Sequence, residues 1–134
     1  MAISLLEADG AERLRARINS DPEFRLISRD MALNLAIQVH DEARLMKFHA
    51  GTLTSITRFV PLTEPIDITI RGPAEFWAKL LMPVPPPRFQ NLYAAIRAGT
   101  CEVIGDSELY NAYFAALTRM IDVMRTLENG QAPR

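Results

Sequence analysis

The stretch from residue 107 to residue 127 is the feature that most constrains how this chain of 134 residues can fold. At about 100° per residue, its apolar side chains spread over an arc of roughly 200°, whereas a helix lying on one sheet needs a stripe of about 100°. These side chains belong to Leu109, Tyr110, Tyr113, Phe114, Ala116, Leu117, Met120, Ile121, Val123, Met124 and Leu127. If the apolar side chains beyond that stripe were exposed, they would form a large hydrophobic patch that favours aggregation. We therefore expect a long C-terminal helix that contacts a sheet and also other helices, a second subunit or a bound apolar molecule.

Alternating hydrophobicity predicts the strands. From Met31 to Val39, five apolar residues occupy every second position, which favours a half-buried strand. Short turns separate this stretch from the next two, so the first three strands should form an antiparallel meander. The predicted strands are 31–39, 44–50, 53–60, 66–70 and 101–104. Together they predict one α+β domain, with a five-stranded, largely antiparallel sheet covered on one face by helices.

Capping residues indicate where the first two helices begin. Ser4 and Glu7 have the spacing of a capping box, in which each side chain satisfies the other's backbone N–H. Asp21 followed by Pro22 is typical of an N-cap with proline at the first helical position. Two helices are therefore expected before the meander.

Three further helices are predicted after the meander, at 73–82, 88–98 and 107–127. Pro73 suits the first turn of the first of these helices, and Asp106 or Ser107 can cap the last. Four prolines within residues 82–87 exclude a helix and a central strand there. The tail at 128–134 is expected to be disordered.

Composition narrows the range of partners. The formal net charge is −1, which gives no electrostatic reason to expect nucleic acid and no polybasic surface for anionic lipids. No apolar run approaches the roughly 20 residues that span a bilayer. The first residues do not resemble a signal peptide, and a lone cysteine, Cys101, is compatible with a reducing compartment. We therefore expect a cytoplasmic domain, with no membrane span and no cofactor.

No catalytic motif stands out. His40 and His49 lie near the ends of adjacent predicted strands, but no carboxylate pattern accompanies them, so they make a weak metal site. Cys101 is expected to be a small buried residue rather than a nucleophile. The run from Arg71 to Glu75 is compatible with an anion site at a helix start, although a strand exit and helix capping explain it equally well. The prolines at 85–87 are read as a stiff loop rather than as a ligand for a polyproline-binding domain.

Three segments carry a family resemblance. They are Ile18-Asn19-Ser20-Asp21-Pro22-Glu23-Phe24 before the meander, Ile66-Asp67-Ile68-Thr69-Ile70-Arg71-Gly72 before a helix with Phe76-Trp77, and Ala98-Gly99-Thr100-Cys101-Glu102-Val103-Ile104-Gly105-Asp106 before the final helix. With this order of elements, residues 11–125 resemble sterol-carrier-protein type-2 domains of the single-domain bacterial kind. The resemblance implies a five-stranded sheet covered by helices, with a hydrophobic tunnel for sterols, fatty acyl chains or other lipids, and no catalytic residues. The four prolines between the last two segments depart from that family.

The leading hypothesis is a noncatalytic binding or carrier domain for an apolar, lipid-like ligand of the sterol, fatty acyl or quinone type. The ligand would lie between the sheet and the helices. The expected contacts, chosen by helix face, are Phe76, Trp77, Leu80, Phe89, Tyr93, Tyr113, Leu117, Ile121 and Met124. Tyr93 and Tyr113 could orient a polar head, since tyrosine is apolar with a polar tip.

Two alternatives are kept. In the first, the chain is a protein-interaction module or a homodimer, its cavity is filled by side chains, and the surplus apolar arc binds a partner. In the second, it is a small isomerase or cyclase, which would need a buried acid–base pair. Only Asp67 or His49 is available for such a pair, and the order of elements disagrees with those enzymes because this chain ends in a helix.

Overall fold

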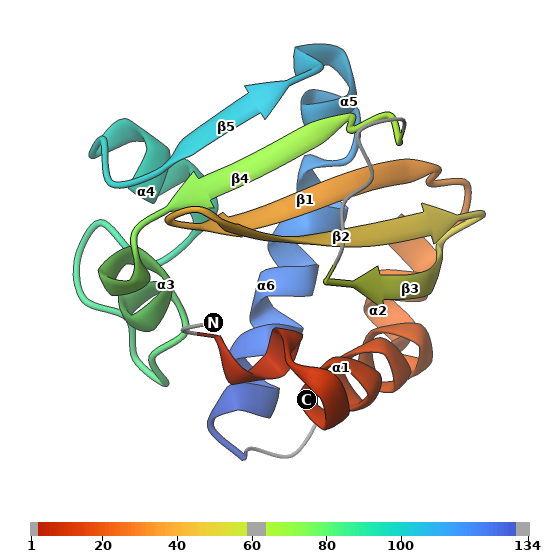
Figure 1. Cartoon of the computed structure of the whole chain (residues 1–134), viewed down its shortest axis with the longest axis horizontal. Helices are drawn as coiled ribbons and strands as arrows, with labels where there is room; N and C mark the ends of the chain where they lie inside the picture. The colour runs from red at the N-terminus through yellow and green to blue at the C-terminus, as the bar shows by residue number, and fades with distance from the viewer. Residues whose placement is uncertain (1–2, 59–63, 131–134) are drawn as a thin grey trace.

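A computed structural model describes residues 3–58 and 64–130 and has an α+β fold built on one five-stranded sheet (Figure 1). The strands are β1 Leu33–Val39, β2 Glu42–His49, β3 Thr52–Thr57, β4 Ile68–Gly72 and β5 Glu102–Gly105. The helices are the 3₁₀ turn η1 Ser4–Leu6 and the α-helices α1 Ala8–Ser20, α2 Pro22–Ile27, α3 Ala74–Leu80, α4 Leu92–Arg97, α5 Ser107–Ala112 and α6 Phe114–Glu128. The predicted fold class is confirmed.

The sheet has the strand order β3-β2-β1-β4-β5. Strands β1, β2 and β3 form the predicted antiparallel meander. Strand β4 then pairs with the other edge of β1 in parallel, and β5 returns antiparallel to β4. The long connection from β3 to β4 makes the one parallel pairing possible. Of the predicted third strand, β3 ends at Thr57, and residues 59 and 60 lie outside the described residues.

The alternation predicted for β1 is present. Leu33, Leu35, Ile37 and Val39 are all buried, and Ala36 is buried on the other face as well. Leu33, Leu35, Ile37 and Val39 belong to one continuous core that extends from the sheet into the helices. The core therefore lies between the sheet and the helical layer that covers one of its faces (Figure 1).

The predicted capping box is wrong. The N–H of Glu7 donates to the main-chain oxygen of Ser4, and the Ser4 hydroxyl donates to Glu128 instead. The Glu7 carboxylate accepts a hydrogen bond from Arg44, whose guanidinium is buried on the helix-facing side of β2. A buried charge needs a counter-charge. The Glu7 carboxylate therefore pairs with Arg44 and does not form the local capping box with Ser4.

The second predicted cap is confirmed. The N–H of Phe24 donates to the Asp21 carboxylate at 2.8 Å, and Pro22 occupies the first turn of α2. Asp106 likewise caps α5, accepting from the N–H groups of Glu108 and Leu109.

The final helix is not continuous as predicted. It breaks at Tyr113, whose backbone leaves the helical conformation, and α5 and α6 follow one another on either side of the break. In α6, six apolar side chains are buried: Ala116, Leu117, Met120, Ile121, Val123 and Met124. They join the core beneath the sheet, and α6 also contacts η1, α1 and α2. The second surface that the wide apolar arc required is therefore the N-terminal helices of the same chain.

The helix predicted at 88–98 is shorter than expected. Helix α4 begins only after Asn91, whose side chain accepts a hydrogen bond from the N–H of Ala94. Phe89 stays outside the helix, in a turn where its N–H donates to the oxygen of Pro86. Residues 82–87 form neither helix nor strand, as predicted, and Pro73 precedes α3 as its N-cap instead of lying in its first turn.

The described helices include none that is both long and apolar enough to cross a membrane. Helix α6 ends at Glu128, and Asn129 donates hydrogen bonds to the oxygens of Leu81 and Arg125. The last part of the predicted tail, 131–134, lies outside the described residues.

Candidate ligand-binding site

A hollow of about 540 Å³ opens where the ends of β1 and β4 meet α3 and the start of β5. Its lining combines aromatic, small and charged residues: His40, Arg71, Gly72, Pro73, Glu75, Phe76, Lys79, Phe89, Gly99, Thr100, Cys101 and Glu102. This volume lies within the range of about 300–1,000 Å³ that small-molecule sites occupy.

Two phenylalanines form the apolar wall of the hollow. Phe76 is fully buried in α3, and Phe89 packs against it with ring centroids 6.5 Å apart. On its other side, Phe76 meets Trp77 edge-on at 4.8 Å. The aromatic wall is thus continuous with the core behind it.

Gly72 makes room for this wall. It is the last residue of β4, and a Cβ atom there would overlap the ring of Phe76. Any larger residue would push the ring out of its place against Trp77. The glycine therefore positions the apolar wall by a close approach of the strand backbone.

Charged side chains surround the mouth of the hollow in two ion pairs. Arg71 of β4 pairs with Glu102 of β5 at 2.9 Å, across the two neighbouring strands. Lys79 pairs with Glu75 one turn earlier in α3 at 2.8 Å, and its ammonium lies 5.3 Å from the centre of the Phe89 ring. An amphipathic molecule would thus meet aromatic rings inside and charges at the rim.

Cys101 is buried at the edge of this hollow, as predicted. Burial, with a smaller contribution from Glu102, raises the pKa of its thiol to about 11. The thiol is therefore protonated at neutral pH, and only a thiolate would be a nucleophile.

Of the nine residues predicted to contact a ligand, Phe76 and Phe89 line the hollow. Five others are buried in the core, and they are Trp77, Leu80, Leu117, Ile121 and Met124. The indole N–H of Trp77 donates to the main-chain oxygen of Gln38, which ties α3 to β1.

The two tyrosines lie elsewhere. Tyr93 is exposed on α4, where Arg97 donates a hydrogen bond to its hydroxyl. Tyr113 is half-buried at the break between α5 and α6. Neither lines the hollow beside Phe76.

The charged rim was visible in part in the sequence. The run from Arg71 to Glu75 had the composition of an anion site, and Glu75 and Lys79 have the i, i+4 spacing of a helical ion pair. Glu102 gave no signal, because its pairing with Arg71 depends on β5 lying beside β4.

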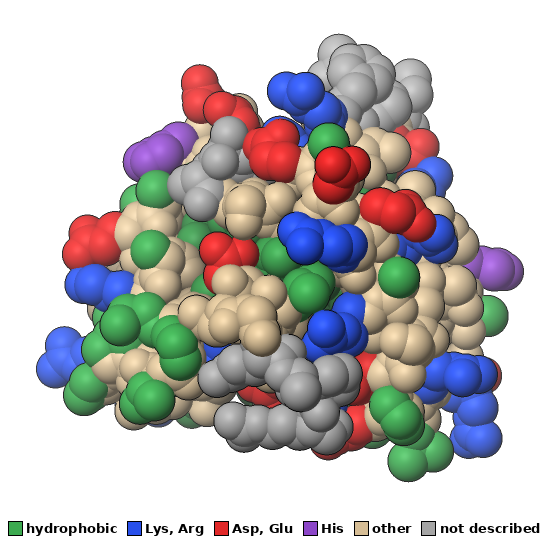
Figure 2. Space-filling model, turned by 90° about the horizontal axis from the view of Figure 1, so that it is seen from below, with side chains coloured by type: hydrophobic (Ala, Val, Ile, Leu, Met, Phe, Trp, Pro, Cys, Tyr) green, Lys and Arg blue, Asp and Glu red, His purple; other side chains and the backbone are tan. Residues whose placement is uncertain are grey.

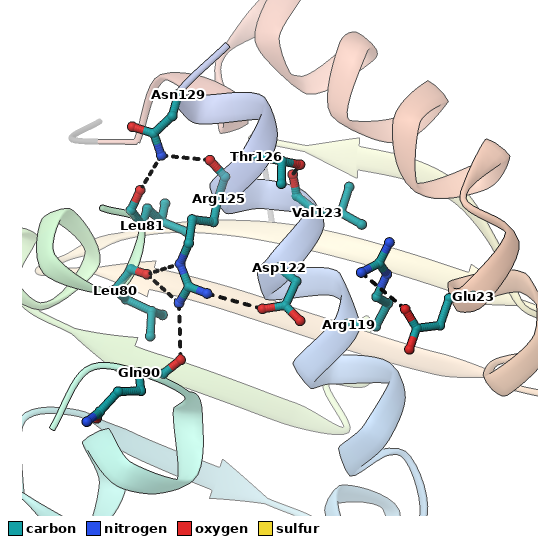
Figure 3. A network of polar contacts seen from close by, with 10 residues as sticks. All are labelled: Glu23, Leu80, Leu81, Gln90, Arg119, Asp122, Val123, Arg125, Thr126 and Asn129. Atoms are coloured by element: carbon teal, nitrogen blue, oxygen red, sulfur yellow. Dashed lines mark hydrogen bonds and ion pairs between the residues drawn. The ribbon is translucent and has the colours of Figure 1, made fainter. Parts of the chain in front are cut away.

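A network of hydrogen bonds holds the end of α3 and the segment before α4 onto α6 (Figure 3). Arg125 donates to the main-chain oxygens of Leu80, at the end of α3, and of Gln90, just before α4. It also pairs with Asp122, and Asn129 donates to Leu81. The wall of the hollow is therefore tied to the C-terminal helix through backbone oxygens.

The two histidines considered as a metal site are not brought together. His40 lies in the turn before β2 and His49 is the last residue of β2, so the length of the strand separates them. No cluster of metal-ligating side chains occurs among residues 3–58 and 64–130. Asp67 and His49 line a separate shallow hollow of about 350 Å³, where the Asp67 carboxylate accepts the N–H of Asn34.

No known protein family profile matches this chain, and no curated protein matches it either. Solved structures do share its fold. A crystal structure of sterol carrier protein 2 superposes with a TM-score of 0.73 at 16% identity, covering 91% of this chain and 98% of that one.

Two further structures agree. A conserved hypothetical protein of Thermus thermophilus, described as possibly sterol carrier protein, has a TM-score of 0.72 at 15% identity and covers 98% of this chain and 94% of that one. The UbiJ-SCP2 ubiquinone synthesis protein has a TM-score of 0.58 at 22% identity and covers 90% of this chain and 95% of that one. The chain therefore has the fold of sterol carrier protein 2, and the resemblance seen in its motifs is confirmed for the fold.

Proposed function

We propose that this protein is a noncatalytic, cytoplasmic binding or carrier domain for an apolar, lipid-like ligand. The observation that carries the proposal is the hollow of about 540 Å³ beside α3, with its wall of Phe76 and Phe89. Burial of apolar ligand surface against such a wall supplies about 25 cal/mol per Å² before the costs of binding. The fold shared with sterol carrier protein 2 supports the same class of ligand.

In this proposal the apolar end of the ligand contacts Phe76 and Phe89 directly. A longer ligand that reaches past Phe76 would meet the buried side chains behind it, which include Trp77, Leu80, Leu117, Ile121 and Met124. These side chains are closely packed in the structure, so a tunnel between the sheet and the helices would require the helical layer to move. Tyr93 and Tyr113 are not given a role in holding the head group.

The chemistry of the hollow supports a carrier rather than an enzyme. The thiol of Cys101 stays protonated at neutral pH, and the charged groups at the rim are engaged in ion pairs. A carrier needs only an apolar wall and an opening, and both are provided here.

The test is displacement of N-phenyl-1-naphthylamine, a neutral probe that fluoresces in apolar sites, by sterols, acyl chains and quinones. Phe89→Ala should weaken binding about tenfold or more, because it removes the more exposed of the two rings that form the apolar wall. Val84→Ala is the matched control, since Val84 lies in the same segment but is exposed and does not line the hollow.

Native mass spectrometry of the gently purified protein provides an independent measurement. A copurified apolar molecule that is lost in Phe89→Ala would support the proposal. If no ligand of the three classes displaces the probe and none copurifies, the chain is not a carrier of apolar molecules.

A further inference from the structure

Phe76 lies at the boundary between the hollow beside α3 and the core. It lines the hollow and yet is only 1% exposed, so most of its side chain is packed among the core residues. Phe89, the other ring of the apolar wall, is half-buried. Phe76 is therefore the ring that an apolar ligand would meet at the inner end of the hollow.

Contacts on three sides fix the Phe76 ring at this boundary. The backbone of Gly72 approaches so closely that a Cβ atom there would overlap the ring. The ring of Trp77 meets it edge-on at 4.8 Å, and the indole N–H of Trp77 donates to the oxygen of Gln38 at 3.2 Å. The ring of Phe89 lies 6.5 Å away. Phe76 therefore cannot turn toward the sheet unless β4 or Trp77 moves with it.

The core behind Phe76 is filled by side chains of α3 and α6. None of these is more than 2% exposed, and they are Trp77, Leu80, Leu117, Ile121 and Met124. Protein interiors are packed as densely as organic crystals, so a hydrocarbon chain can enter the core only where side chains move out of its way. An apolar ligand would therefore bury its carbon atoms as far as Phe76 and leave any further ones in water.

We propose that Phe76 sets the length limit of the hollow, so that the protein selects short or compact apolar molecules over long acyl chains. This inference rests on the proposed carrier function. The inner end of the ligand contacts the Phe76 ring, and each carbon between that ring and the mouth of the hollow is buried. Carbons beyond the mouth stay in water and add nothing to the affinity. A long-chain lipid thus binds no more tightly than a shorter homologue that already fills the hollow.

The experiment measures affinity against chain length in the even-numbered alkan-1-ols from hexan-1-ol to tetradecan-1-ol. This series is neutral, which keeps the charges at the rim out of the comparison. Each alcohol, kept below its solubility limit, displaces N-phenyl-1-naphthylamine from the protein. Every methylene group that becomes buried should tighten binding about fourfold. We expect this gain for the first members and a constant affinity once the chain reaches from Phe76 to the mouth.

The position of the chain end can be measured separately, because Trp77 is the sole tryptophan of the chain. Its ring lies against Phe76, so a bromine atom on the inner end of a ligand should quench its fluorescence. We expect 8-bromooctan-1-ol to quench Trp77 and octan-1-ol to displace the probe without quenching. If the brominated alcohol displaces the probe and leaves Trp77 unquenched, the ligand does not reach Phe76 and the proposal is wrong.

Phe76→Ala should extend the length limit. Removing the ring opens the space that it occupied to the ligand. The longest alcohols should then bind about tenfold more tightly than the members at which the unaltered protein levels off. Phe76→Leu removes fewer atoms and should shift the limit in the same direction by a smaller factor. If Phe76→Ala does not fold, Phe76→Leu carries the comparison.

Phe24→Ala is the matched control, because it makes the same chemical change in the same core. Phe24 is fully buried in α2, packs against Phe48 with ring centroids 5.9 Å apart, and does not line the hollow. Its replacement should destabilise the protein as Phe76→Ala does and leave the length limit unchanged. Thermal unfolding of each variant checks that it is folded.

The negative results are distinguishable. If no alcohol displaces the probe, the carrier function and the length limit are both wrong. If affinity rises by the same factor at every step up to tetradecan-1-ol, the carrier function stands and the length limit is overturned. If the Phe76 variants level off where the unaltered protein does, or if Phe24→Ala shifts the limit equally, the assignment to Phe76 is overturned.

Discussion

Asp21 combines two tasks in one buried carboxylate. It accepts the N–H of Phe24 as the cap of α2, and it accepts two hydrogen bonds from Arg119 of α6, at 2.8 and 2.9 Å. Arg119 also pairs with the exposed Glu23. The hydrogen bond from Arg119 is the main reason that the pKa of Asp21 is lowered below its usual value of 3.8, against the opposing effect of burial.

This arrangement predicts how stability depends on pH. Because the pKa of Asp21 is lower in the folded protein, its contribution is complete above the unfolded value near 3.8 and is lost as the pH falls through the folded value. Asp21→Asn keeps a helix cap but loses the ion pair, and should lower the free energy of unfolding by about 2–3 kcal/mol at neutral pH.

The measurement is urea unfolding of both proteins from pH 7 down to pH 2. The difference between them should shrink below about pH 4, as the carboxylate of the unaltered protein is protonated. Glu23→Gln is the control and should cost no more than about 1 kcal/mol, since that ion pair is exposed. A difference that stays constant over the whole range would contradict this assignment.

Arg88 has a left-handed backbone conformation in the turn before Phe89. Its φ of +75° is unusual for a residue with a side chain, and it lies directly after the proline run. The turn that includes it is closed by the hydrogen bond from Phe89 to Pro86. The turn follows the proline segment and places Phe89 against Phe76.

At the scale of elements, the segment from α3 to α4 is held to α6 mainly at its backbone. The oxygen of Leu80 is among the last carbonyls of α3, which have no partner within the helix. Arg125 donates to it twice and to Gln90 once, while Asn129 binds Leu81 (Figure 3). The side chain of Arg125 thus links the end of α3 to the segment just before α4.

Arg125→Ala should therefore loosen this segment locally. We expect the free energy of unfolding to fall by about 2 kcal/mol, because buried carbonyl groups lose their donors. Hydrogen exchange of the amides in residues 80–91 should accelerate more than exchange in β1. Arg97→Ala, at an exposed position on α4, is the control and should change neither quantity. Equal acceleration throughout the chain would contradict a local role for Arg125.

At the scale of the whole molecule, the wide apolar arc of the C-terminal region is covered within the chain. Helix α6 buries it against the sheet and against η1, α1 and α2. The exposed apolar residues that remain include Met82 and Val84 in the proline segment. Hydrophobic side chains also gather at the left of Figure 2, the side on which α3 lies in Figure 1.

Because the arc is covered, we expect the protein to sediment as a monomer at micromolar concentrations. The measurement is analytical ultracentrifugation over a hundredfold range of concentration. A concentration-dependent dimer would favour the alternative of an interaction module. Val84→Asp would then show whether the proline segment forms the interface, since a charge there would dissociate the dimer.

Features that depend on neighbouring residues were predictable. The sequence predicts the alternation in β1 and the caps at Asp21 and Asp106. The buried face of a strand and the first turn of a helix each depend on only a few neighbouring residues. Phe76 was assigned to the ligand site for the same reason, since its spacing places it on the apolar face of α3.

Features that depend on residues distant in the sequence were not predictable. The predicted capping box at Ser4 and Glu7 is wrong because the Glu7 carboxylate accepts a hydrogen bond from Arg44, which lies more than thirty residues later in the sequence. The arc of the last helix was identified from sequence, but the structure alone decided that helices of the same chain cover it.

The sequence by itself determined the order of the strands and of most helices and the side of each that is apolar, because these follow from local geometry and hydrophobic periodicity. The break at Tyr113 and the short α4 were not determined in this way. The tertiary structure decided that the apolar arc is filled from within. It also decided that Arg71, Lys79, Phe89 and Glu102 meet around one hollow. The reason is physical: these residues come from separate elements, and only the pairing of β4 with β5 and the packing of α3 bring their side chains together.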